Sequence, residues 1–142
     1  MSFARNGLAF LKQMVKFTTE MKSFENVLQG VRVVDGGEGR CQCEMTVKEE
    51  HQNADGTLHG GMTATLVGAV SAWALMTTER QVPGVSVDLS VSFMKPVKIG
   101  NDIVIDADTL KIGKTLAFCS VDIKLKSDGS LVAQGKHTTY VG

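Results

Sequence analysis

A pair of glycines joins a polar loop to a long apolar segment in the stretch HQNADGTLHGGMTATLVGAVSAWALM, residues 51–76. The apolar part has the length and pattern of a helix that begins near His59. The first amides of a helix lack intrahelical acceptors and lie at the positive end of its dipole. Glycine lets a ligand approach such amides closely. The His59-Gly60-Gly61 junction therefore favours an oxyanion site for acyl-transfer chemistry. A purely structural alternative stays open, because an Asn-x-x-Gly loop also marks an ordinary helix start.

Two predicted turns further along the chain carry lysines that suit a phosphate-rich ligand. They read Lys95-Pro96-Val97-Lys98 and Lys111-Ile112-Gly113-Lys114-Thr115. Lysine is an effective point-charge partner for phosphate, and a glycine turn exposes backbone N–H groups. The alternative is that these lysines are solvated charges that protect strand edges. The GKT sequence is not a Walker A loop, because the upstream glycine is missing at the required spacing.

Composition excludes several classes of function. The chain has 142 residues, with 15 basic and 15 acidic side chains and no net charge, which predicts one domain over residues 1–142. This balance argues against a general nucleic-acid binder. The three cysteines are odd in number and the three histidines are scattered, so no zinc-ligand spacing is present and a reducing compartment is expected. No run approaches the roughly 20 apolar residues of a membrane span.

The hydrophobic pattern predicts an α+β domain. We expect an N-terminal helix, a hairpin that turns at Asp35-Gly36-Gly37, a loop over 51–58 and a helix over about 59–78. Strands are predicted at 85–94, 102–111, 115–126 and 130–141, joined by short turns as an antiparallel meander. In the first of these, alternation places Val85, Val87, Leu89, Val91 and Phe93 on one face, with Ser86 and Asp88 together on the other.

The central helix has almost no polar side, so it must be buried. The economical arrangement is a curved antiparallel sheet of about six strands wrapped around that helix. Such a small sheet leaves an edge strand exposed, which predicts at least a dimer. The N-terminal segment MSFARNGLAFLKQMVKFTTEMK is basic and poor in acids, as in mitochondrial transit segments. We favour a helix packed on the domain, with the apolar side Phe10, Leu11, Met14, Val15 and Phe17.

The motifs HQNADGTLHGGMTATLV, PGVSVDLSVSFMKPVKIGNDI and LKIGKTLAF resemble those of the hotdog-fold acyl-CoA thioesterases, in particular the thioesterase superfamily member 2 group. The resemblance implies that Asn53 and Gly60 polarise the thioester carbonyl and that Ser86 orients the attacking water. We expect His59 to fix the loop by hydrogen bonding. The resemblance also implies a homotetramer built as a dimer of dimers with active sites between subunits, and no cofactor beyond the coenzyme A of the substrate. We expect a cytoplasmic location, and the basic N-terminal segment leaves mitochondrial association open.

In that family, coenzyme A lies along the two lysine turns and the strand before the first of them. The residues that correspond are Asp88, Phe93, Met94, Lys95, Pro96, Val97, Lys98, Lys111, Ile112, Gly113, Lys114, Thr115 and Leu116. We expect the acyl chain to lie beside the central helix, along Met62, Leu66, Trp73 and Met94.

One catalytic group of the family is missing. The family carries an aspartate on the central helix at the position of Gly68. Asp55, just before the helix, is our first candidate for a carboxylate that replaces this aspartate. Asp88 is the second, on the expectation that it shares a strand face with Ser86 about 6–7 Å away. Glu79 is about 16 Å further along the helix than Gly68 and is too distant. Asp55 and Asp88 also have ordinary structural interpretations, as a loop residue and a strand residue.

Two functions from different classes follow. The first is an acyl-CoA thioesterase that releases fatty acid and coenzyme A from medium- or long-chain substrates, and it is favoured by Asn53, His59, Gly60 and Ser86. The second is a non-hydrolytic acyl-CoA binder, favoured by Gly68. A scaffold that uses the fold only for interaction is a weaker third hypothesis.

Overall fold

The computed structural model describes residues 7–142 of the 142-residue chain, so Arg5 of the basic N-terminal segment lies outside the described residues. The expected α+β class is confirmed. In chain order the elements are α2 (Leu8–Thr19), η1 (Phe24–Leu28), β1 (Arg32–Gly37), β2 (Arg40–Thr46), η2 (Glu49–His51), α3 (Gly60–Met76), β3 (Val85–Phe93), β4 (Asp102–Ile112), β5 (Leu116–Leu125) and β6 (Leu131–Tyr140).

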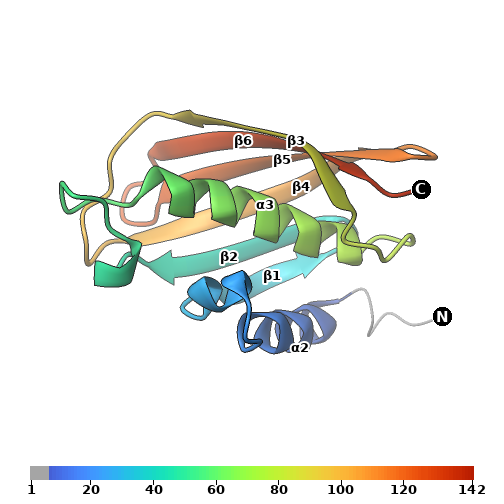
Figure 1. Cartoon of the computed structure of the whole chain (residues 1–142), viewed down its shortest axis with the longest axis horizontal. Helices are drawn as coiled ribbons and strands as arrows, with labels where there is room; N and C mark the ends of the chain where they lie inside the picture. The colour runs from blue at the N-terminus through green and yellow to red at the C-terminus, as the bar shows by residue number, and fades with distance from the viewer. Residues whose placement is uncertain (1–6) are drawn as a thin grey trace.

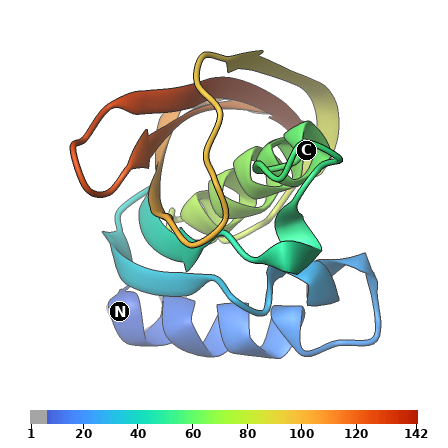
Figure 2. The same cartoon turned by 90° about the vertical axis from the view of Figure 1, so that its left-hand side faces the viewer.

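All neighbouring strands pair antiparallel in one six-stranded sheet, in the order β1-β2-β4-β5-β6-β3. The sheet curls around α3, and α2 lies outside the barrel-like curve beside β1 (Figures 1 and 2). The predicted meander is wrong for β3, which pairs with β6 and not with β4. Strand β4 has β2 at one edge and β5 at the other, so it offers β3 no free edge. Strand β3 therefore forms an outer edge of the sheet.

The central helix is buried along most of its length, as its apolar pattern predicts. Leu66, Val67 and Val70 are fully buried in the main core, and burial of each such side chain contributes about 1.5–3 kcal/mol. The helix packs so closely on β6 that a Cβ at Gly135 would come within 2.5 Å of Val67 Cγ1. Gly135 therefore brings the middle of α3 onto β6.

The β1–β2 hairpin is correct, but its predicted turn is displaced. The turn lies at Glu38 and Gly39, which have φ angles of +53° and +84°. Two positive φ angles in a two-residue loop define a type I′ turn, which matches the twist of the strands it joins. Asp35-Gly36-Gly37 lies in β1, and Asp35 Oδ1 accepts a hydrogen bond from the Gly36 N–H. Asp35-Gly36-Gly37 has the residue types that favour turns, so the sequence predicts the turn there rather than at Glu38-Gly39.

A bulge in β3 corrects the predicted alternation of that strand. Ser86 pairs with Thr139 and Asp88 with Thr138, so Val87 is an extra residue between them. Because paired residues share a face, Ser86 lies on the helix-facing side with Leu89, while Asp88 lies on the opposite side. The expectation that Ser86 and Asp88 share a face is wrong. Val85 is likewise separated from the Leu89, Val91 and Phe93 side, because it pairs with the exposed Tyr140.

The N-terminal helix packs with only part of its apolar side. Leu11 and Val15 are buried against the domain, whereas the Phe17 side chain is 71% exposed. Met21 and Phe24, which follow the helix, are also exposed. Among the described residues no helix is long and apolar enough to cross a bilayer.

Candidate active site

The loop before α3 is held by the side chain of Asn53. Its Oδ1 accepts hydrogen bonds from the backbone N–H of Asp55, at 2.9 Å, and of Thr57, at 3.1 Å. Its Nδ2 donates to Thr57 Oγ1 at 2.9 Å. Asparagine favours this local bonding in turns. The carboxamide carries two N–H groups, so one of them remains for a ligand after the bond to Thr57.

His59 caps the start of the central helix. Its Nδ1 accepts a hydrogen bond from the Gly61 N–H at 2.8 Å, and its backbone N–H donates to the carbonyl of His51. Gly60, the first residue of α3, has no acceptor within the helix for its own N–H. A Cβ at Gly60 would lie 3.4 Å from the ring of Phe93, so glycine keeps this amide accessible beside the ring. The structure places Asn53, His59 and Gly60 on one continuous loop and helix terminus.

The first lysine turn lies against this same loop. The Leu58 N–H donates to the Val97 carbonyl at 2.8 Å, and Thr57 forms an antiparallel bridge with Lys98. Lys95 is partly engaged, because its Nζ donates to Ser130 Oγ and lies 3.7 Å from Asp128 Oδ2. Hydrogen bonds from the Ser130 side chain and backbone, with a smaller contribution from Lys95, lower the pKa of Asp128. Lys98 thus lies next to the amide site, while Lys95 faces the β5–β6 turn.

Ser86, which is exposed in the single chain, contacts a buried polar pair that the sequence reasoning missed. Ser86 Oγ lies 2.7 Å from Nε2 of His137, and Nδ1 of His137 lies 2.7 Å from Oγ of Ser71 on α3. His137 is only 4% exposed, and burial lowers its pKa. The alternation of β6 could have indicated this position, because His137 lies on the same face as Gly135, the face that packs on α3. Three separate elements, α3, β3 and β6, therefore position one imidazole.

None of the candidate carboxylates is seen to contact Ser86 or His137 in the described chain. Asp55 is exposed in the Asn53 loop, and Asp88 faces away from Ser86 because of the bulge. Glu79 is exposed beyond the end of α3. At Gly68, one turn of helix before Ser71, an added Cβ would meet no atom within 4 Å. The position of the family's aspartate is thus open, and Asp88 is excluded as a partner of Ser86 within the chain.

Within one chain, the two halves of the predicted site lie at opposite ends of the sheet. Ser71 is about 16 Å along α3 from Gly60. Gly60 adjoins Phe93 at the far end of β3, roughly 20 Å from Ser86. Figure 1 shows the loop before α3 and the β3–β4 connection at one end, and the β4–β5 turn at the other. The amide site and the serine–histidine group therefore cannot act on one carbonyl within a single chain.

The second lysine turn lies at the serine–histidine end. Leu116 and Val85 both pair with Tyr140, which places the 111–116 turn beside the start of β3. Arg80 donates hydrogen bonds to the carbonyls of Gly113 and Val141 and so ties this turn to the C-terminal strand. The predicted coenzyme A residues thus divide into two groups, one at each end of the sheet.

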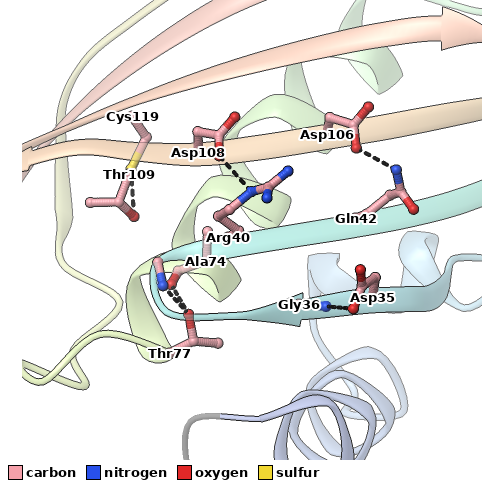
Figure 3. Close-up of polar contacts among 11 residues, drawn as sticks. Asp35, Gly36, Arg40, Gln42, Ala74, Thr77, Asp106, Asp108, Thr109 and Cys119 are labelled. Atoms are coloured by element: carbon pink, nitrogen blue, oxygen red, sulfur yellow. Dashed lines mark hydrogen bonds and ion pairs between the residues drawn. The ribbon is translucent and has the colours of Figure 1, made fainter.

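A cleft of about 1020 Å³ lies between the β1–β2 hairpin and the end of α3. Its polar groups largely bind one another: Gln42 Nε2 donates to Asp106 Oδ1 at 2.7 Å, and Arg40 pairs with Asp108 at 2.9 Å (Figure 3). Thr77 Oγ1 donates to the Ala74 carbonyl and accepts from the Gly39 N–H. Of the predicted site residues only Ile112 lines this cleft. The predicted catalytic residues therefore lie elsewhere.

The cysteines are buried and reduced. Cys41 and Cys43 point the same way from β2, with their sulfur atoms 3.7 Å apart. The thiol hydrogen bond between them is the largest of the effects that raise the pKa of Cys43, ahead of burial. Among residues 7–142, no three His, Cys, Asp or Glu side chains are grouped as metal ligands.

Comparison with known proteins identifies the family. The thioesterase superfamily model matches residues 55–132. The human protein named acyl-coenzyme A thioesterase 13 is 53% identical over 132 residues, which cover 93% of this chain and 94% of that protein. The zebra fish thioesterase superfamily member 2 structure superimposes with a TM-score of 0.94 at 48% identity, over 95% of this chain and 98% of that one. The mouse thioesterase superfamily member 2 structure gives 0.89 at 48% identity with full coverage of both chains. The chain belongs to the thioesterase superfamily and has its hotdog fold.

Proposed function

We propose that this enzyme hydrolyses medium- or long-chain fatty acyl-CoA to free fatty acid and coenzyme A. The observation that carries the proposal is the junction of Asn53, Gly60 and Lys98. The Asn53 carboxamide and the first amide of α3 lie on one loop and helix start, and the lysine-bearing segment is held to the same loop at Thr57 and Leu58. Such donors stabilise the oxyanion that forms when water attacks a thioester, and a lysine there suits the phosphates of coenzyme A. The relative named acyl-coenzyme A thioesterase 13 supports the same substrate class.

The proposal includes a dimer formed through β3. The outer edge of this strand has no partner within the described chain, and it carries exposed apolar side chains such as Val85, at 69%, and Phe93, at 60%. An apolar, unpaired strand edge favours pairing with another copy. Antiparallel pairing around a two-fold axis near Leu89 would place the Ser86 end of one strand beside the Phe93 end of the other.

Such a dimer would complete two sites at once. Asn53 and Gly60 of one copy would approach Ser86 and His137 of the other, and the two lysine turns would meet across the same boundary. The separation of these groups within one chain is the physical reason for requiring the second copy. The family resemblance extends the assembly to a dimer of dimers.

The acyl chain would extend from this boundary along the central helix. Met62, Leu66 and Trp73 are buried in the core, whereas Met94 is 49% exposed beside the first lysine turn. Met94 is therefore the member of the predicted set that a ligand reaches first. Met62 and Trp73 would contact the chain only if it inserts between helix and sheet.

A second candidate function is non-hydrolytic binding of acyl-CoA. It is favoured by Gly68, which leaves α3 without the carboxylate of the family. The polarising loop and both lysine turns are retained in that case, so binding would persist without turnover.

Release of free thiol from acyl-CoA esters of graded chain length tests the proposal. The expected result is thiol release with a maximum kcat/KM at medium or long chains, together with binding of a non-hydrolysable thioether analogue. Binding of the analogue without thiol release would establish the second candidate. Failure to bind the analogue would reject both functions.

A further inference from the structure

We infer that His137, acting through Ser86, receives the proton of the attacking water and so replaces the carboxylate that α3 lacks at Gly68. This inference rests on the proposed thioester hydrolysis. His137 does not touch the substrate in this arrangement, so it is a positioning and proton-accepting residue behind Ser86. The direction of the hydrogen bonds, the surroundings of the imidazole and the other two histidines of the chain support it.

The contacts around Ser71 favour one tautomer of His137. We assign the single hydroxyl proton of Ser71 to the Gly68 carbonyl, which lies 3.0 Å from Ser71 Oγ and can only accept a hydrogen bond. Ser71 Oγ must then accept from His137, which places a proton on Nδ1 at the 2.7 Å contact. A neutral imidazole with a proton on Nδ1 has a lone pair on Nε2. That lone pair faces Ser86 Oγ at 2.7 Å, so Ser86 donates to His137 and keeps its own lone pairs for a water molecule.

The other histidines have the opposite arrangement. Nδ1 of His51 accepts from the Lys48 N–H at 3.0 Å, and Nδ1 of His59 accepts from the Gly61 N–H at 2.8 Å. Each therefore carries its proton on Nε2 when neutral and has no free basic nitrogen. Of the three histidines in the sequence, His137 alone presents a lone pair to a side-chain hydroxyl.

The surroundings keep this imidazole neutral. Ser71 faces it from α3, Ser86 and Leu89 from β3, and Cys119 from β5. Cys119 is the titratable member of this set, and burial raises its pKa, so the thiol is uncharged near neutral pH. Burial lowers the pKa of His137 itself. Thr139 pairs with Ser86 in the sheet. Its Oγ1 is the one buried side-chain nitrogen or oxygen atom in the described chain that lacks a hydrogen-bond partner, so it can still bond to a polar group near Ser86.

The proton balance of the step is complete. Water adds to the thioester carbon while its proton passes to Ser86 Oγ, and the Ser86 proton passes to His137 Nε2. The resulting oxyanion is held by the Asn53 and Gly60 donors of the other copy. The carbon–sulfur bond then breaks, and the imidazolium returns its proton through Ser86 to the departing thiolate. The products are a carboxylic acid and coenzyme A thiol, and the enzyme is unchanged.

The variant His137→Gln tests the inference in the full-length oligomer. Glutamine reaches Ser86 with an amide that accepts a hydrogen bond but does not take up a proton. We expect kcat for thiol release to fall by about 100-fold or more, as for removal of a general base, while Kd for the thioether analogue stays the same. In the wild type, kcat should decline in acid with an apparent pKa below 6.5, and this decline should disappear in the variant.

Two controls separate this role from the other histidines. His51→Gln and His59→Asn should each retain the acidic decline of kcat, because neither changes His137. The double variant Ser86→Ala with His137→Gln should lose no more activity than the stronger single variant, because the two residues act as a unit. Wild-type turnover with an unchanged kcat and acidic decline in His137→Gln would overturn the inference. Absence of wild-type turnover would instead reject the proposed function.

If His137→Gln does not fold, nitrogen-15 NMR of the wild type provides the decision. The inference requires a protonated Nδ1 at His137 and a protonated Nε2 at His51 and His59 near neutral pH. A protonated Nε2 at His137 would place the lone pair on the wrong nitrogen and overturn the inference.

Discussion

Ser86 Oγ lies 2.7 Å from His137 Nε2 because Val87 is bulged out of β3. If the strand were regular, Val87 would take the position opposite Thr139, and Ser86 would pair with Tyr140 on the outer face, which would leave the imidazole without this partner. The bulge therefore converts an ordinary alternating serine into one that faces the buried side of the sheet. Asp88 pairs with Thr138 on the outer face, so a hydroxyl and not a carboxylate meets His137.

Mixed oligomers test the proposal that the site spans two chains. Asn53→Ala and Ser86→Ala should each be nearly inactive alone. If the two residues act on one carbonyl from different copies, a one-to-one mixture refolded together should contain heterodimers with one intact site. Random pairing predicts recovery of roughly a quarter of the wild-type kcat. Thiol release measured before and after co-refolding provides the comparison.

The matched control is a mixture of two variants on the same side of the site. Ser86→Ala and His137→Gln lie in one cluster, so their mixed dimers contain no site with both residues intact, and activity should not return. Recovery in this control, or none in the first mixture, would contradict an interface of the proposed geometry.

Restoring a carboxylate to the central helix should increase turnover. An added Cβ at Gly68 meets no atom within 4 Å, so a side chain can start from this position without a clash at Cβ. We expect Gly68→Asp to raise kcat severalfold and to restore part of the activity lost in His137→Gln, because it supplies a second proton acceptor. Gly68→Ala is the control: it should stabilise the helix by up to about 1 kcal/mol and leave kcat unchanged. A Gly68→Asp variant that folds but is no faster would show that the missing carboxylate does not limit the reaction.

Two substitutions at Asn53 separate its structural and catalytic roles. Asn53→Asp keeps an oxygen acceptor for the N–H groups of Asp55 and Thr57, but it places negative charge where the oxyanion forms. We expect a folded variant whose kcat falls by about 100-fold or more, the effect of losing one oxyanion donor. Asn53→Ala should lose similar activity and also the loop bonds, at about 1 kcal/mol each. Thermal unfolding and thiol release measure the two effects, and normal turnover in Asn53→Asp would remove the carboxamide from the mechanism.

The main elements of the fold follow from short-range patterns in the sequence. An apolar run from Met62 to Met76 predicts a buried helix, and alternating residues between Gly and Asp turns predict strands. The position of β3 at the edge did not follow, because strand order depends on which edges remain free after the other strands pair. The Glu38-Gly39 turn was missed because glutamate rarely adopts a positive φ.

The candidate site was predictable only where local sequence determines it. The Asn53 loop and the Gly60 terminus are contiguous, so their proximity is a property of one segment. The contact of His137 with Ser71 and Ser86 joins three elements that are 15 to 66 residues apart in pairs. It also depends on the bulge at Val87, and nothing about a valine in an alternating strand predicts a bulge.

The stability of the folded protein should fall as the pH drops below 6.5. Burial lowers the pKa of both His51 and His137 from that value. Above it both histidines are neutral in the folded and unfolded chains and have no effect. Below it the unfolded chain takes up protons that the folded chain does not, so each histidine reduces the free energy of unfolding by up to about 1.4 kcal/mol per pH unit. The loss ends once the pH reaches the lowered pKa of the folded state.

Urea unfolding between pH 5 and 7.5, at one protein concentration because oligomerisation adds to stability, measures this slope. The His137→Gln variant should show a shallower decline than the wild type, since one of the two histidines is gone. The lowered pKa of Asp128 acts at a separate, more acidic range, because its ordinary value is 3.8. A slope that is identical in wild type and variant would mean that His137 is protonated equally in both states, contrary to its burial.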